Sequence, residues 1–328
     1  MNLRFLFLFL TTIFSINSIA NISQDTTKLS SSSDTTKFWS FETVSKLIFN
    51  QISLTNWAKG GESSLSGKSD LIFEAKYKKD NISFENDINL AFGLMGFKGD
   101  NDKIKVQKTE DKIDLSSAYG YEAYKNWYVS TVFNFKTQFA NGFKYPDDST
   151  LISDFFSPAY FTLSFGFEYK PSKKLSLFMS PAAGKLILVL NQELANKGAY
   201  GVSPAKYDTS GTMTQKGKKR KAEFGINIIC KVKDEIFKNI IGETKLVLYN
   251  NYLDDNQNNR WNIDIDWETK FELKVNEHIS TNLYFHSIYD HNVLIPEYEL
   301  IDNKKTKISE GPKLQIKESF GVGFTFKF

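Results

Sequence analysis

The sequence has very little cysteine and histidine, and no long apolar run after its amino-terminal segment. The 328 residues include one cysteine, Cys230, so no disulfide can form within the chain. The three histidines are few candidates for general acid–base catalysis. A formal net charge of +3 is too small to argue for nucleic-acid binding. A membrane helix needs roughly 20 apolar residues in a row, and no later stretch supplies them.

Aromatic residues, in contrast, are abundant. They make up 15% of the chain, with 29 Phe and 15 Tyr, although 24% of residues are charged and the mean hydropathy is -0.35. A transmembrane β-barrel can have such soluble-looking averages, because only alternate residues of each strand face lipid. Its aromatic side chains gather in girdles at the two membrane interfaces.

A period of two in hydrophobicity predicts strands along most of the chain. In 261–274, the residues Trp261, Ile263, Ile265 and Trp267 alternate with polar and mostly acidic residues, a pattern that no amphipathic helix generates. We expect about twelve such strands. They are Lys46–Trp57, Ser66–Lys78, Ile82–Phe97, Asp111–Ala123, Trp127–Phe139, Tyr160–Lys170, Leu175–Val189, Ala222–Lys233, Glu243–Leu253, Trp261–Lys274, Ile279–Asp290 and Leu314–Phe328.

The connections between these strands are alternately short and longer, with the longest at 98–110, 140–159, 190–221 and 291–313. Outer-membrane barrels have short periplasmic turns and long surface loops, and an even strand number places both chain ends in the periplasm. The predicted fold is therefore an all-β, up-and-down antiparallel transmembrane barrel. The alternative is a soluble β-sandwich or secreted barrel whose apolar faces point inward.

The amino-terminus predicts export. Residues 1–20 combine Arg4, an apolar run from Phe5 to Leu10 and a small-x-small ending at Ser18–Ala20, which is typical of a signal peptide. The Ser/Thr-rich segment 21–37 reads as a flexible periplasmic lead-in, and 38–328 as the barrel. These features together predict the outer membrane of a Gram-negative cell as the location.

Two segments resemble known families. The strand Leu314–Phe328, with Phe324, Phe326 and the terminal Phe328, resembles the last strand of bacterial outer-membrane barrels, which implies recognition by the barrel-assembly machinery. The stretch 51–67, with Asn56, Trp57, Gly60 and Gly61, resembles the opening signature of a family of Bacteroidota outer-membrane proteins catalogued as domain of unknown function 3078. That resemblance implies a barrel and supplies no activity.

The polar rows of the strands predict the lining of the barrel. Its predicted members include Glu85, Asp87, Glu168, Glu223, Asp264, Asp266, Glu268, Glu272 and His286. In this prediction acidic residues outnumber basic ones, so a pore would favour small polar or cationic solutes. Two alternatives remain open: a non-conducting barrel whose charges pair across the lumen and which presents surface loops, and a lipid-acting enzyme.

No convincing catalytic, cofactor or metal site emerges from the sequence. Ser280 shares the polar row of His286 but lies roughly 20 Å away along a strand, too far to act as a nucleophile with it. Asp100–Asp102 and Asp254–Asn256 offer oxygen ligands without the spacing of a calcium loop, and turn chemistry explains them. A basic run at 216–221 is either a solvated charge run or a contact for lipopolysaccharide phosphates, in an envelope of outer-membrane lipid.

Overall fold

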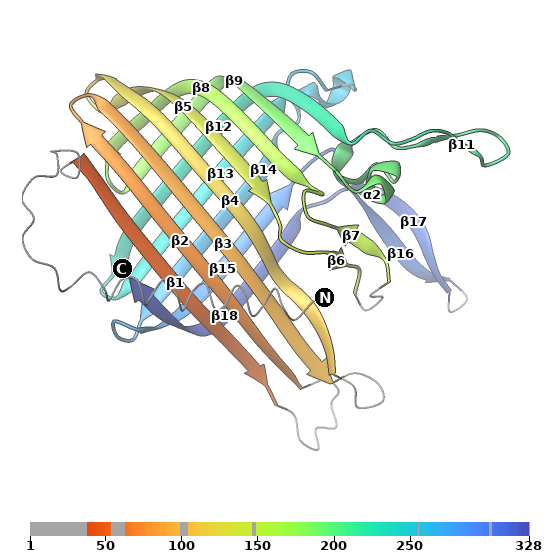
Figure 1. Cartoon of the computed structure of the whole chain (residues 1–328), viewed down its shortest axis with the longest axis horizontal. Helices are drawn as coiled ribbons and strands as arrows, with labels where there is room; N and C mark the ends of the chain where they lie inside the picture. The colour runs from red at the N-terminus through yellow and green to blue at the C-terminus, as the bar shows by residue number, and fades with distance from the viewer. Residues whose placement is uncertain are drawn as a thin grey trace, which may run out of the picture. The chain divides into compact units, whose positions relative to one another are not determined.

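The computed structural model describes residues 38–53, 63–98, 104–145, 149–254, 256–301 and 304–327. Twelve long strands form one closed antiparallel barrel, in the ring order β1-β18-β15-β14-β13-β12-β9-β8-β5-β4-β3-β2 (Figure 1). They are β1 (Trp39–Ile52), β2 (Ser64–Lys79), β3 (Ile82–Lys98), β4 (Ile104–Tyr124), β5 (Trp127–Thr137), β8 (Ala159–Ser172), β9 (Leu175–Leu188), β12 (Arg220–Phe237), β13 (Ile240–Asn251), β14 (Asp264–Lys274), β15 (Ile279–Tyr289) and β18 (Gln315–Lys327).

Strands that follow one another around the barrel are hydrogen-bonded neighbours, and β1 closes the ring against β18 from Val44↔Lys327 to Phe49↔Val322. This confirms the predicted up-and-down barrel of twelve strands. One end of the barrel carries tight turns such as 80–81 and 173–174, and we call it the turn end. The other end, the loop end, carries the longer connections.

Short elements lie within the longer connections at the loop end, where Figure 1 shows them projecting beyond the barrel wall. They are β6 (Gly142–Phe143), β7 (Leu151–Ser153), α2 (Gln192–Asn196), η4 (Ala199–Gly201), β10 (Lys206–Tyr207), β11 (Met213–Gln215), η5 (Gln257–Trp261), β16 (Leu294–Ile301) and β17 (Lys304–Pro312). Their strands pair only with each other, so the period-two search for barrel strands did not identify them. No helix in the described segments is both long and apolar enough to span a bilayer.

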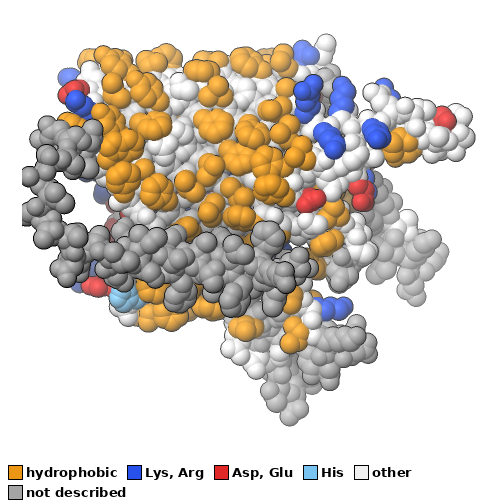
Figure 2. Space-filling view, in the orientation of Figure 1, with side chains coloured by type: hydrophobic (Ala, Val, Ile, Leu, Met, Phe, Trp, Pro, Cys, Tyr) orange, Lys and Arg blue, Asp and Glu red, His pale blue; other side chains and the backbone are white. Residues whose placement is uncertain are grey.

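The apolar side chains of the barrel face outward. On β18, Ile316 and Phe320 are 62% and 58% exposed, whereas Thr325 on the alternate row is 3% exposed. Figure 2 shows hydrophobic side chains over the visible face of the wall between the two ends. The alternative prediction, a soluble sandwich or barrel with inward-facing apolar rows, is therefore wrong, because the apolar rows remain on the surface of the folded barrel.

Two strands begin well before their predicted starts. The first begins at Trp39 instead of Lys46, because Trp39 pairs with Tyr77 on β2 and packs its ring 5.2 Å from the ring of Tyr77. Its predicted end at Trp57 lies outside the described residues. The predicted long connection at 98–110 is also wrong. The polar segment that begins at Ile104 continues β4 and pairs with β3 as far as Lys98↔Ile104.

A β-bulge in β9 reverses which residues face inward. Phe165 on β8 pairs with Ala182, but Phe167 pairs with Met179, so β9 has an extra residue at this point. Pro181 lies in the bulge, where its missing N–H does no harm to the ladder. Past the bulge, Lys185 faces the same side as Phe178, although an uninterrupted period of two would place them on opposite faces.

Gly166 makes this bulge possible, and its replacement is expected to destabilise the barrel. A Cβ atom added to Gly166 would lie 2.1 Å from the carbonyl oxygen of Met179, so Gly166→Ala forces the backbone apart. We expect the free energy of unfolding to fall by about 1–3 kcal/mol, the usual range for overpacking, measured by urea unfolding in detergent micelles. The matched control is Gly184→Ala in β9, where nothing lies within 4 Å. Equal stability of the two variants would contradict this explanation of Gly166.

Several predicted features lie outside the described residues. They are the signal peptide at 1–20, the lead-in at 21–37, the oxygen-rich segment Asp100–Asp102, the signature residues Asn56, Trp57, Gly60 and Gly61, and the terminal Phe328 of the assembly signal. Phe324 and Phe326 of that signal are described. Both lie on the outward row of β18, at 45% and 42% exposure.

Candidate functional site

Each of the nine residues predicted to line the lumen has a charged partner within 4.0 Å, and many of these partners come from distant strands. The pairs are Lys46–Glu272, Lys112–Glu268, Lys136–Asp266, Lys170–Glu85, Lys170–Glu168, Lys185–Glu223, Lys185–Asp264, Lys231–Asp87 and His286–Asp266. Because buried charges need partners, this pairing is what allows so many ionisable groups inside a closed barrel.

Six charged side chains lie close together inside the barrel, and we call them the central cluster: Lys112, Asp114, Lys136, Lys245, Asp266 and Glu268. Lys112 Nζ lies 3.1 Å from Glu268 and 3.6 Å from Asp114, and Lys245 Nζ lies 3.9 Å from Asp114. Lys136 Nζ donates a hydrogen bond of 2.8 Å to Asp266. Three positive and three negative side chains therefore compensate one another.

The central cluster joins opposite walls of the barrel. Lys112 comes from β4 and Glu268 from β14, and five strands separate β4 from β14 in either direction around the ring. Four strands separate the partners by the shorter route in Lys136–Asp266 and in Lys245–Asp114. The side chains of these pairs therefore meet in the interior of the barrel.

Further pairs cross the interior away from the central cluster. Lys231 of β12 reaches Asp87 of β3 at 3.3 Å, and Lys317 of β18 reaches Glu110 of β4 at 2.8 Å. Lys46 of β1 donates to Glu272 of β14 at 2.7 Å. The charged groups of opposite sign are thus matched at several positions along the strands.

The sequence prediction left several interior lysines unassigned, so the predicted acidic excess omitted part of the positive charge inside the barrel. Lys112 and Lys170 share the inner rows of Asp114 and Glu168, so counting by two along the strand would have found them. Lys46 likewise lies on an inner row, and Lys68 contacts Glu110 at 3.7 Å. Lys185 could not be found by counting, since the bulge in β9 moves it to the inner face.

Apolar packing fills another part of the interior. Val132, Phe178 and Ile229, from three strands, form a buried cluster with Ala118 and Val247 against it. A neighbouring cavity holds about 60 Å³ and is lined by residues that include Phe178, Ile229 and four charged side chains. This volume accommodates only a few water molecules.

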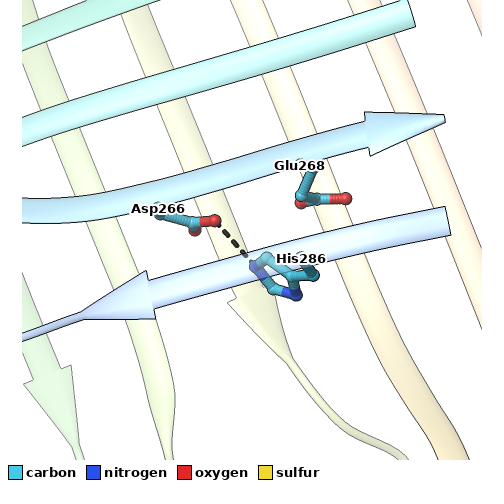
Figure 3. Close-up of side chains that lie close together, drawn as sticks. All are labelled: Asp266, Glu268 and His286. Atoms are coloured by element: carbon cyan, nitrogen blue, oxygen red, sulfur yellow. Dashed lines mark hydrogen bonds and ion pairs between the residues drawn. The ribbon is translucent and has the colours of Figure 1, made fainter. Parts of the chain in front are cut away.

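His286 belongs to the hydrogen-bond network around the central cluster. Figure 3 shows Asp266 and Glu268 on one strand and His286 on the next, with the imidazole directed at Asp266. His286 Nε2 lies 2.8 Å from Asp266 Oδ1, and the ligand atoms of the three residues lie within 4.8 Å of one another. Three such donors could hold a metal ion, but the ammonium groups of Lys112 and Lys136 already lie beside the two carboxylates and repel a cation.

The other sequence candidates make structural contacts. Ser280 is 1% exposed, and its hydroxyl accepts a hydrogen bond from Asn282 at 3.1 Å, while His286 contacts Asp266. Asp254 accepts a hydrogen bond from the backbone N–H of Asn256 at 2.8 Å and another from the Asn292 amide at 3.1 Å. These contacts agree with turn chemistry at Asp254.

At the loop end, residues 138–145, 149–158 and 189–219 form one interlocked unit, which we call the surface platform. Val189, Leu194, Ala195 and Val202 form its buried core. Its outer contacts join the two connections: the Leu190 N–H donates to the Phe156 carbonyl at 3.1 Å, and the Tyr200 hydroxyl donates to the Ile152 carbonyl at 2.7 Å. Burial raises the pKa of Tyr200 to about 12, so this donor keeps its proton at any physiological pH.

Sequence comparison adds a partial match. A protein-family profile described as "Protein of unknown function (DUF3078)" matches residues 49–143, a range that contains the stretch 51–67 with the resemblance noted above. The search of curated proteins returned no match.

Solved structures with related folds have low sequence identity to this chain. An outer membrane channel from Pseudomonas putida F1 is 10% identical, with 89% of this chain and 96% of that chain covered and a TM-score of 0.37. The translocator domain of the autotransporter NalP from Neisseria meningitidis is 8% identical, with 96% and 95% covered and a TM-score of 0.34. The fold assignment stands on the strand pairing of this chain itself.

Proposed function

We propose that this protein is an integral outer-membrane barrel with a closed lumen, and that it holds the surface platform at the cell exterior. Membrane insertion is supported by the outward apolar rows, because soluble proteins rarely expose large continuous apolar surfaces. The alternating turn and loop lengths support an orientation with the turn end in the periplasm.

The single observation that carries the closed lumen is the contact of Lys112 with Glu268 between opposite walls. A water-filled pore would leave these ammonium and carboxylate groups hydrated and apart. The central cluster and the buried group around Phe178 fill the interior instead. A passive channel for cations therefore has less support than a non-conducting barrel.

Planar-bilayer recording tests this proposal. We expect the purified, folded protein to insert and to give no single-channel steps in high salt, because side chains from opposite walls occupy the lumen. Insertion is verified separately, by protection of the barrel from protease in vesicles. Inserted protein that gave regular, cation-selective steps would refute the closed lumen and return the channel to first place.

A further inference from the structure

Three exposed basic side chains, Lys218, Lys219 and Arg220, lie at the loop end of the wall, and we call them the basic rim. Arg220 is the first residue of β12 and pairs with Leu188, the last residue of β9. Figure 2 shows Lys and Arg side chains gathered at this end of the barrel, beside the apolar belt of the wall. The basic rim thus begins where the lipid-facing rows end.

A hollow on the surface brings the basic rim together with apolar side chains. It has a volume of about 450 Å³ and is lined by Leu188, Leu190 and the three basic residues. Leu190 is 49% exposed, and Leu186 and Phe224 continue the exposed apolar surface along β9 and β12 at 36% and 43%. The hollow therefore offers an apolar wall and a cationic edge to the same ligand.

The backbone of the basic rim is held in place by the surface platform. The Lys218 N–H donates to the Ser203 carbonyl at 2.9 Å, and the Lys219 carbonyl accepts from the Val189 N–H at 2.8 Å. Gly217, immediately before the rim, donates to the Asn196 side chain at 2.9 Å. This backbone is ordered before any ligand arrives, which reduces the entropy lost on binding.

The charges of the basic rim have no carboxylate partner in the described part of the chain. Lys221, the next residue, pairs with Glu223 at 2.7 Å on the inner face. Among the described residues, no carboxylate forms an ion pair with Lys218, Lys219 or Arg220. Three adjacent positive charges at a membrane interface attract an anion, and an arginine guanidinium can bind phosphate through two parallel hydrogen bonds.

We propose that this hollow binds a phosphorylated glycolipid of the outer leaflet, namely lipopolysaccharide. The phosphate lies against the basic rim, and an acyl chain lies along Leu188, Leu190 and the exposed row below them. The phosphates of a nucleic acid or the carboxylates of an acidic protein would contact the basic rim, but they would leave the apolar side chains of the hollow without a partner. The inference rests on the membrane location proposed above, because only a barrel in the outer membrane meets this lipid.

Binding of bisphosphorylated lipid A in detergent micelles, titrated by native mass spectrometry, tests the site. The variant Lys218→Gln, Lys219→Gln, Arg220→Gln is expected to bind at least about tenfold more weakly than the wild type, because three interfacial charges are lost. The matched control is Lys125→Gln, Lys173→Gln, Lys238→Gln, which removes three exposed charges from turns at the turn end and leaves binding unchanged. Dephosphorylated lipid A should bind the wild type as weakly as lipid A binds the first variant.

Each other outcome overturns the proposal. Equal binding by the wild type and the rim variant would remove the basic rim from the site, and equal binding of dephosphorylated lipid A would reduce the contact to apolar adhesion. Full competition by inorganic phosphate would make the ligand a free anion instead of a glycolipid. Heat-modifiable gel migration and vesicle insertion are scored separately for every variant. Failure of the wild type to insert would refute the membrane location, whereas insertion without phosphate-dependent binding refutes this inference alone.

Discussion

Replacing the six charged residues of the central cluster with serine is expected to make the barrel conduct ions. The variant carries Lys112→Ser, Asp114→Ser, Lys136→Ser, Lys245→Ser, Asp266→Ser and Glu268→Ser. Removal of three positive and three negative charges leaves the net charge unchanged. The long side chains that join β4, β5 and β13 to the opposite part of the barrel are then absent, and water can enter a lumen wider than that of an eight-stranded barrel.

We expect single-channel steps in planar bilayers from this variant, where the wild type is silent. The matched control replaces three exposed pairs with serine: Lys174–Asp234, Lys197–Glu193 and Lys313–Glu297. It also removes three charges of each sign but leaves the lumen untouched, so it should remain silent. A folded, inserted central-cluster variant without conductance would mean that the remaining interior contacts, such as Lys231–Asp87 and the packing around Phe178, close the lumen by themselves.

Removing a single partner from the central cluster is expected to destabilise the barrel strongly. Lys112→Met takes away the ammonium group that lies between Glu268 and Asp114, and these two carboxyl groups are only 6% exposed as residues. Glu268 then keeps only a hydrogen bond of 3.0 Å from the Tyr284 hydroxyl as an inner partner, together with more distant charges. Breaking a buried ion pair in this way costs about 3 kcal/mol of unfolding free energy.

Urea unfolding in vesicles, followed by tryptophan fluorescence, measures this loss. The control is Lys197→Met in the exposed Lys197–Glu193 pair, which should leave the unfolding midpoint nearly unchanged because water screens both groups. Adding Glu268→Met to Lys112→Met should recover part of the stability, since the uncompensated charge then disappears. If Lys112→Met alone proved as stable as the wild type, water would have to reach Glu268 freely, and the closed lumen would be contradicted.

The sequence predicted the strands best where one face had to be apolar and the other polar. Ile82–Phe97 and Ile279–Asp290 were predicted nearly at their observed bounds, because each alternate residue meets a different environment. Trp261–Lys274 was predicted three residues too long at its start, where Trp261 ends the helix η5. The start of β1 was missed, although Trp39 and Phe41 alternate with Ser40 and Glu42 there and pair with β2 from Trp39↔Tyr77. The hairpins of the loop end were missed because their strands pair only with each other.

The candidate site was less predictable than the fold. The acidic residues of the inner rows were identified from their strands, but their partners were not, because Lys112 and Glu268 are far apart in the chain and meet only when the ring closes. Lys185 was not predicted to face the interior for a second reason. Its position depends on a bulge at Pro181, which shifts every later residue of β9 to the other face.

By itself, the sequence determined that this chain forms a barrel of twelve strands with one apolar and one polar face on each. Period-two hydrophobicity is a local property, so the sequence of each strand indicates which of its two faces is apolar and which is polar. Only the tertiary structure decided which charged side chains meet inside the barrel, and that three basic side chains at the loop end form no ion pair with any described residue. These properties depend on which strands face one another across the ring. The sequence of a single strand does not show which strand lies opposite it.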